Sequence, residues 1–271
     1  MSGAAGAGDV IITFGSANGL TTNTAGTPGR ELWTLNEYGL HPQAGDGFGT
    51  ALASGDFNGD GYSDLAIGIP GRTVQVGLFQ HQQAGAVWIL YGSASGLQAS
   101  ANCFDANTLD GLHPLRITYD NARLGQSLAW GNFNGDQHNG NDIGDLAIGI
   151  PGAGTVHNLF FPYTNTGAVW ILGGTAGGGL GTGGPTIETL VLPEDYGTGD
   201  PSQFVGARFG SVMTSTDVDG DGFSELLVGA PGKTVGLFVN GNCVQACVTE
   251  AGMVTQILLP FTFGGPIRRE R

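Results

Sequence analysis

The fold is decided by the stretch Asp56-Phe57-Asn58-Gly59-Asp60-Gly61-Tyr62-Ser63-Asp64-Leu65-Ala66-Ile67-Gly68-Ile69-Pro70-Gly71, because its pattern returns twice. The second copy runs from Asn132 to Gly152 and the third from Asp217 to Gly232. In each copy a turn rich in Asp, Asn and Gly leads into a short apolar run that ends in Pro-Gly. Such repetition predicts one supersecondary unit that is used several times.

The repeated unit extends beyond this phrase. A variable stretch follows each Pro-Gly, and then comes an apolar segment bounded by glycine, at residues 85–93 and 167–174, with weaker copies at 8–16 and 252–258. An apolar, β-branched run of this length predicts a strand that is covered on both faces. We expect a fourth, outer strand after each of these segments, at Thr34-Leu35, Thr108-Leu109 and Thr189-Leu190.

Four short strands per unit, repeated radially, predict an all-β fold of propeller blades, each with four antiparallel strands. Helical periodicity is absent, so no helix is expected. We expect a single region over 1–271, with a half-blade at 8–35 and repeats at approximately 36–107, 108–192 and 193–271. About three blades cannot close a ring, so the chain is expected to be part of a larger or oligomeric propeller.

Composition limits the function classes. The net charge is −14 and Lys233 is the single lysine, which argues against nucleic-acid binding because phosphates could not be neutralised. No apolar run approaches the roughly 18 residues of a membrane span. The first residues lack the features of a signal peptide, so an exported protein would be represented here as a mature form or a fragment. Cys243 and Cys247 could close a small disulfide ring, which leaves Cys103 over, and three free thiols are the alternative.

The acidic turn has the spacing of a cation site. Calcium takes about 6–8 oxygen ligands, and oxygens spaced two apart around a glycine bend at Gly61 meet that need. A simple hairpin turn is the alternative for one such turn, but three matched copies favour the cation site. In the first copy, side-chain oxygens fall at positions one, three, five and nine and a carbonyl at position seven: Asp56, Asn58, Asp60, Asp64 and Tyr62.

The other two copies differ in their donors, and up to three calcium ions are expected. The candidates of the third turn are Asp217, Asp219, Asp221, Phe223 through its carbonyl, and Glu225. The second turn offers Asn132, Asn134, Asp136 and Asp145, with Asp142 as a competitor for the last place. We expect the second site to be the weakest, because Asn132 carries no charge and residues 137–144 contain an insertion.

These motifs resemble the FG-GAP repeat of integrin α-subunits. Phe48-Gly49 and Phe209-Gly210 match its first element, Gly229-Ala230-Pro231 matches the second, and Gly68-Ile69-Pro70 and Gly149-Ile150-Pro151 are variants of the second. The resemblance implies a β-propeller whose calcium ions staple the first two strands of a blade. It also implies an extracellular or cell-surface protein whose other loops contact partners.

The leading hypothesis is a non-catalytic, calcium-stabilised module for adhesion, protein or glycan binding, or structural assembly. Its candidate contact loops are 72–84, 153–166 and 233–251, and the first and third share a motif that predicts a hairpin or a self-assembly contact. Phe79, Phe160, Phe161 and Phe238 would suit an interface between copies of the chain if exposed. The alternative is a propeller domain that accompanies or forms a secreted hydrolase, for which Glu194, Asp195 and Asp200 are the only grouped loop acids.

Overall fold

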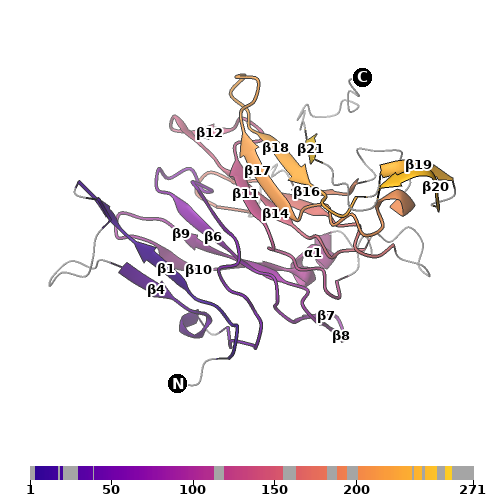
Figure 1. The fold of residues 1–271 in the computed structure, drawn as a ribbon. Helices are drawn as coiled ribbons and strands as arrows, with labels where there is room; N and C mark the ends of the chain where they lie inside the picture. Colours follow the sequence, from indigo (N-terminus) through magenta and orange to yellow (C-terminus); the bar gives the residue numbers. More distant parts are fainter. Residues whose placement is uncertain are drawn as a thin grey trace.

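The repeated segments form antiparallel sheets that follow one another along the chain in the computed structural model (Figure 1). Across the described residues these sheets form an open row and do not close into a ring. The strands β5, β11 and β17, one from each repeat, lie side by side, with β11 in the middle. The structure describes residues 4–17, 19–20, 30–38, 40–112, 119–154, 163–181, 188–193, 201–233, 235–239, 242–248 and 254–257.

The first two repeats each form a four-stranded sheet. The first sheet has the order β10-β9-β6-β5 and comprises β5 (Leu52–Gly55), β6 (Asp64–Ile69), β9 (Ala86–Tyr91) and β10 (Gln98–Asp105). The second has the order β11-β14-β15-β16 and comprises β11 (Leu128–Gly131), β14 (Asp145–Gly149), β15 (Val169–Leu172) and β16 (Glu188–Val191). The prediction of four antiparallel strands in a repeat is therefore confirmed for both.

Smaller sheets lie at the two ends of the row. The described part of the third repeat has the order β17-β18-β21, with β17 (Val212–Thr216), β18 (Glu225–Gly229) and β21 (Val254–Ile257). Near the N-terminus β1 (Val10–Thr13) pairs with β4 (Arg30–Trp33), inside the expected half-blade.

Four short hairpins project from these sheets. Loops 72–84 and 233–251, which share a sequence motif, both contain a hairpin, as the motif predicts. Cys243 and Cys247 lie on the second strand of the later hairpin, and their side chains are outside the described residues. The hairpins are β2 (Gly15–Ser16) with β3 (Gly19–Leu20), β7 (Val74–Val76) with β8 (Phe79–His81), β12 (Gln137–His138) with β13 (Asn141–Asp142), and β19 (Val235–Val239) with β20 (Asn242–Val248).

The expected absence of helices is wrong. The described residues include the helix α1 (Ala106–Leu112) and the 3₁₀ helices η1 (Leu35–Tyr38) and η3 (Pro201–Phe204). As a result, the expected outer strands at Thr34-Leu35 and Thr108-Leu109 are wrong, whereas Thr189-Leu190 lies on β16 as expected. The helices in the described part of the chain are too short or too polar to traverse a lipid bilayer.

A capping interaction explains why α1 begins where the outer strand was expected to continue. The Asp105 carboxylate accepts hydrogen bonds from the backbone N–H groups of Asn107 and Thr108, both at 3.0 Å. An acceptor at this place satisfies N–H groups that have no partner inside the helix, and so favours helix initiation. Leu109 then packs into the core with no exposed surface.

The sheets pack through faces of unequal bulk. On β6, Ile67 and Ile69 lie in a core cluster with Trp33 of β4, whereas Ala66 faces the second sheet. The next residue on the small face, Gly68, lies so close to the second sheet that an added Cβ would stand 2.1 Å from the carbonyl oxygen of Gly125. Glycine is therefore required for this packing distance, as the alternation of large and small residues along the strand predicts.

The same junction recurs between the second and third sheets. An added Cβ on Gly149 would stand 2.1 Å from the carbonyl oxygen of Gly210. Isolated parallel bridges, Gly85 with Leu124 and Gly167 with Phe209, also tie each sheet to its successor. Successive repeats are thus joined by equivalent contacts.

Candidate metal centre

The first acidic loop joins β5 to β6, and its side chains turn inward onto its own backbone. The Asp56 carboxylate accepts hydrogen bonds from the N–H groups of Gly59 and Gly61, each at 2.7 Å. The Asn58 side-chain oxygen accepts from the N–H of Asp60 at 2.9 Å. This arrangement holds the oxygens of positions one and three inside the turn.

Asp64, at position nine, lies deeper than the rest of the loop. It is 1% exposed, and its two oxygens accept hydrogen bonds from the N–H groups of Phe57 and Gly92, both at 2.7 Å. Burial raises the pKa of Asp64 to about 7, and the nearby Asp56 and Asp60 carboxylates act in the same direction. Asp64 therefore ties the start of the loop to the residue after β9.

Asp145 repeats this arrangement in the second loop. It is fully buried, and its oxygens accept hydrogen bonds from the N–H groups of Phe133 at 2.9 Å and Gly174 at 3.1 Å. Burial raises its pKa to about 7 as well. Its competitor Asp142 is exposed on the β12–β13 hairpin formed by the insertion and accepts from the Gln137 side chain at 2.7 Å. The structure thus places Asp145, not Asp142, at position nine.

The second loop also contains side-chain oxygens without a partner. Asn132 Oδ1 and Asp136 Oδ1 are both buried and have no hydrogen bond. The Asn132 side-chain NH₂ donates to the carbonyl of Asp136 at 3.1 Å, which turns Oδ1 away from that contact. Burial raises the pKa of Asp136. Buried oxygens are rarely left unsatisfied in proteins, and a cation would supply what these two lack.

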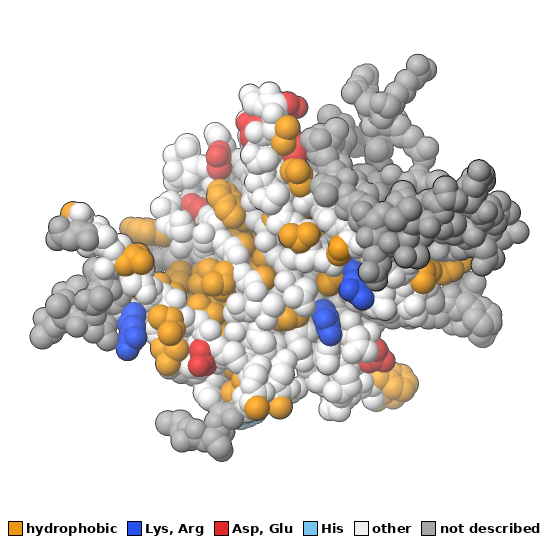
Figure 2. Space-filling view, in the orientation of Figure 1, with side chains coloured by type: hydrophobic (Ala, Val, Ile, Leu, Met, Phe, Trp, Pro, Cys, Tyr) orange, Lys and Arg blue, Asp and Glu red, His pale blue; other side chains and the backbone are white. Residues whose placement is uncertain are grey.

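The third loop joins β17 to β18 and brings three carboxylates together. One oxygen each from Asp217, Asp219 and Glu225 lies within 4.8 Å of the other two. Glu225 is buried and accepts a hydrogen bond from the N–H of Val218 at 2.6 Å, whereas the two aspartates are exposed. Figure 2 shows acidic side chains on the β17–β18 loop at the top of the view.

The donors of the third loop suit a single hard cation. Ligand oxygens at 2.3–2.6 Å from a calcium ion can lie up to about 5 Å from one another, which accommodates the observed spacing. Asp221 does not belong to this group of three carboxylates, and it accepts a hydrogen bond from the N–H of Phe223 at 2.9 Å. All the donors are oxygens, which favours calcium over zinc.

Backbone hydrogen bonds connect each loop to the next. The N–H of Gly144 in the second loop donates to the carbonyl of Asp56 in the first at 2.6 Å. The equivalent N–H in the third loop, that of Ser224, donates to the carbonyl of Asn132 at 2.9 Å. The three loops therefore form a continuous series along one end of the sheets.

Most of the candidate loop acids and interface phenylalanines lie outside the described residues. The grouped loop acids Glu194, Asp195 and Asp200, together with Phe160 and Phe161, lie outside the described residues. The side chain of Phe238 also lies outside them, whereas Phe79 is 71% exposed at the β7–β8 hairpin, as an interface residue would need to be. No sequence pattern indicates that main-chain N–H groups bind the acid at position nine, because every residue except proline carries such a group.

The comparisons with known proteins match these repeats. The model of the FG-GAP repeat family matches residues 48–90 and 209–242, which contain the first and third loops. This chain is an FG-GAP repeat protein. The second repeat lies outside the matched segments, in agreement with the insertion in its loop.

Similar FG-GAP proteins include integrins and a phospholipase. Integrin alpha-PS2 of Drosophila melanogaster is 31% identical over 189 residues, which is 69% of this chain and 12% of the relative. Integrin alpha-5 of Xenopus laevis is 27% identical over 224 residues, which is 82% of this chain and 18% of the relative. Human phosphatidylinositol-glycan-specific phospholipase D is 30% identical over 186 residues, or 68% of this chain and 18% of the relative. The chain thus spans less than a fifth of the length of these relatives.

Proposed function

We propose that this chain is a non-catalytic, calcium-stabilised β-propeller module that serves adhesion, protein or glycan binding, or structural assembly at the cell surface or outside the cell. The observation that carries the proposal is the convergence of Asp217, Asp219 and Glu225 in the third loop. Bound there, calcium would offset the mutual repulsion of these carboxylates and fix the connection between β17 and β18.

Calcium also suits the other two loops. In the second, Asn132 and Asp136 offer the two buried oxygens that lack partners. In the first, Asp56, Asn58 and Asp60 offer oxygens that already face the interior of the turn. The tyrosine and phenylalanine at position seven would contribute through their carbonyl groups alone.

The proposal extends to assembly. Because the sheets of the described residues form an open row, we propose that further blades, from another copy of this chain or from another part of a longer protein, complete the propeller. Light scattering of the purified chain tests the first of these. A dimer or larger species supports completion by a second copy, and a monomer at all concentrations contradicts it.

A secreted hydrolase is the alternative function, and it draws on the name of the phospholipase relatives. The chain spans 18% of the human phospholipase. Integrin alpha-PS2 matches 69% of this chain, a share similar to the 68% that the phospholipase matches. Among the described histidines, His81 pairs with the exposed Asp120 at 3.2 Å, in a contact between a hairpin and a neighbouring loop. The non-catalytic role is therefore favoured.

Thermal unfolding with and without calcium tests the proposal. After chelation with EGTA, added calcium at about 100 times its dissociation constant should stabilise the protein by about 2.7 kcal/mol, and so raise the Tm by about 5–10 °C. The double variant Asp217→Asn/Asp219→Asn should lose part of this rise. Asp120→Asn, which removes an exposed carboxylate outside the loops, is the matched control and should keep it. No rise with calcium, or an equal rise with magnesium, would contradict the proposal.

A further inference from the structure

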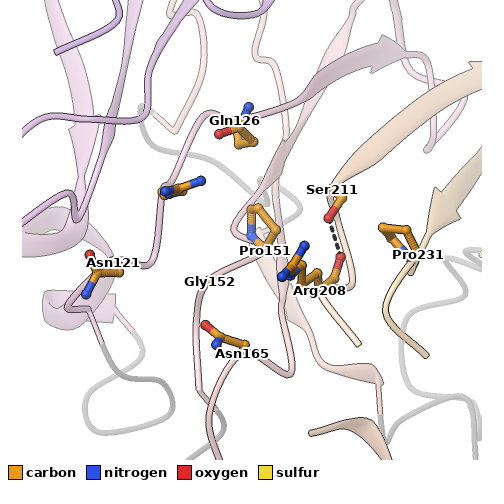
Figure 3. Close-up of a pocket in the computed structure, with 9 residues that line it drawn as sticks. Asn121, Gln126, Pro151, Gly152, Asn165, Arg208, Ser211 and Pro231 are labelled. Atoms are coloured by element: carbon orange, nitrogen blue, oxygen red, sulfur yellow. Dashed lines mark hydrogen bonds between the residues drawn. The ribbon is translucent and has the colours of Figure 1, made fainter. Parts of the chain in front are cut away.

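A polar pocket of about 660 Å³ lies at the ends of the second and third sheets that are opposite to the acidic loops (Figure 3). It is formed where β11 and β17 begin and where the chain leaves β14 and β18. Its polar lining comes from Asn121, Arg123, Gln126, Asn165, Arg208 and Ser211. Figure 3 shows Arg208 beside Pro151, with Asn165 below them in the view.

The charge of this pocket is opposite to that of the chain. The chain carries 23 acidic residues against 9 Lys and Arg, yet both ionisable side chains that line the pocket are arginines. Among the described residues neither arginine has a carboxylate within 4.0 Å, and Arg123 makes one long contact, 3.4 Å, to the Gln83 side chain. Asp120 precedes Asn121, but its carboxylate is engaged by His81. The two positive charges are therefore not neutralised by the described part of the protein.

Both arginines lie at the start of a turn and have a positive φ angle. Arg123 and Arg208 have φ angles of 58° and 55°, a conformation that residues other than glycine rarely adopt. They begin equivalent turns, in which Gln126 and Ser211 donate backbone hydrogen bonds to their carbonyls. The first repeat has Gly47 at this place, with a φ of 69°. Glycine serves in the equivalent turn of the first repeat, so the turn itself does not require an arginine.

The chemistry of the lining selects a ligand class. Guanidinium groups bind carboxylate and phosphate oxygens through paired, charge-assisted hydrogen bonds. The amides of Asn121, Asn165 and Gln126 offer both donors and acceptors, which suits hydroxyl groups. No aromatic ring belongs to the described lining, and both arginines are exposed, so the pocket is open to solvent. We propose that this pocket binds a hydroxyl-rich organic anion, a sugar acid or a sugar phosphate, with Arg123 and Arg208 on the anionic group.

This inference gives a ligand class to the binding role proposed above and rests on that role. It involves other residues than the calcium loops, so the two fail separately. If the pocket binds no sugar anion while calcium still raises the Tm, this inference alone is overturned. If calcium has no effect and the sugar anion still binds, the calcium proposal alone is overturned.

Titration calorimetry with glucuronate, glucose 6-phosphate, inorganic phosphate and glucose tests the inference. We expect glucuronate or glucose 6-phosphate to bind, and glucose to bind at least about tenfold more weakly because it lacks the charge that the arginines recognise. Affinity should fall as salt is raised, because ion pairs at an open pocket are screened. Methyl glucuronide distinguishes the source: retained binding indicates a glycan-linked sugar acid, and lost binding a free one.

The glycine at the equivalent place in the first repeat suggests which substitutions to test. Arg123→Gly and Arg208→Gly introduce the residue that Gly47 provides, so each should fold with unchanged or higher stability. Each should weaken the binding of the sugar anion by about tenfold or more. Arg30→Ala removes an exposed arginine on β4, outside the pocket, and should leave affinity unchanged.

Three results would overturn the inference. The first is that no anion binds more tightly than glucose. The second is that both glycine variants bind as the unmodified protein does. The third is that inorganic phosphate binds as tightly as glucose 6-phosphate, because the hydroxyl groups would then contribute nothing.

Discussion

The three acidic loops share oxygen side chains at positions one, three and five, but the first two loops and the third use the acid at position nine differently. Asp64 and Asp145 each accept hydrogen bonds from two backbone N–H groups, one at the start of the loop and one just after the third strand of the sheet. Glu225 accepts from the N–H of Val218 and also lies within 4.8 Å of the Asp217 and Asp219 oxygens.

Side-chain length accounts for the difference. The short aspartate side chain is held at the strand, where two main-chain donors surround it. The additional methylene group of glutamate lets the carboxylate keep the contact to the start of the loop and also approach the acids at positions one and three. The same place in the repeat therefore serves as a buried structural acceptor in one case and as part of an acidic cluster in the other.

The largest effect is expected from removing the buried acceptor. Asp64→Ala would leave the N–H groups of Phe57 and Gly92 buried without an acceptor, which should cost about 2–5 kcal/mol of unfolding free energy. Glu225→Ala removes the one such contact that the described residues show, from the N–H of Val218, and should cost about 1–2 kcal/mol. Urea unfolding in EGTA measures both values. Equal losses would contradict the distinction between the two loops.

The stabilisation by calcium should depend more on the third loop than on the other loops, which reverses the order expected for stability in EGTA. Asp219→Asn removes a charge from the assembled triad and should reduce the calcium-induced rise in Tm by about 3–5 °C, the shift that about 1 kcal/mol or slightly more produces in a protein of this size. Asp136→Asn, in the loop expected to be weakest, should reduce the rise by less than about 2 °C. Thermal scans with EGTA and with calcium measure the difference. A larger loss from Asp136→Asn would reverse the predicted ranking of the sites.

Acid should stabilise the calcium-free protein through the first two loops. The pKa values of Asp64 and Asp145 are raised to about 7 in the fold from 3.8, so the folded state binds more protons than the unfolded state between about pH 4 and pH 7. Stability in EGTA should therefore fall as the pH rises from 5 to 7.5, with a loss in Tm of about 3 °C or more. In Asp145→Asn, the matched variant, the fall should be smaller. A Tm that increases over this range would contradict the burial of these carboxyl groups.

The smallest effect is expected from converting the third loop to the type of the first. Glu225→Asp retains the charge but shortens the side chain, and should cost about 0.5–1 kcal/mol in EGTA through a weakened hydrogen bond to Val218. It should also weaken calcium binding several-fold, measured with a calcium-sensitive dye. Unchanged affinity would show that side-chain length does not decide the role of position nine.

Much of the repeat organisation could be predicted from the sequence because it depends on side chains. The apolar runs at residues 85–93 and 167–174 have buried strands at their centres, β9 and β15. Large and small residues alternate along β6 in the sequence, and the small residue Gly68 lies on the closely packed face. In contrast, α1 depends on one aspartate cap at Asp105, and a seven-residue helix is too short to show a periodic pattern.

The candidate site was predicted only in part, for a related reason. The positions of the acids follow from spacing, but the partners of Asp64 are main-chain N–H groups, which leave no trace in the sequence. The pocket did leave a signal: Arg123 and Arg208 each precede an apolar residue and glycine at the same place in two repeats. The first repeat obscured it, because Gly47 occupies the equivalent place.

The glycine contacts and parallel bridges between successive sheets bear on how such a chain can change its length during evolution. Because Gly68 meets Gly125 as Gly149 meets Gly210, every whole unit offers its neighbour the same docking edge. Duplication or loss of an entire unit in a gene would therefore preserve all the remaining junctions. A deletion that removed only part of a unit would separate a docking edge from its counterpart, and selection should eliminate it.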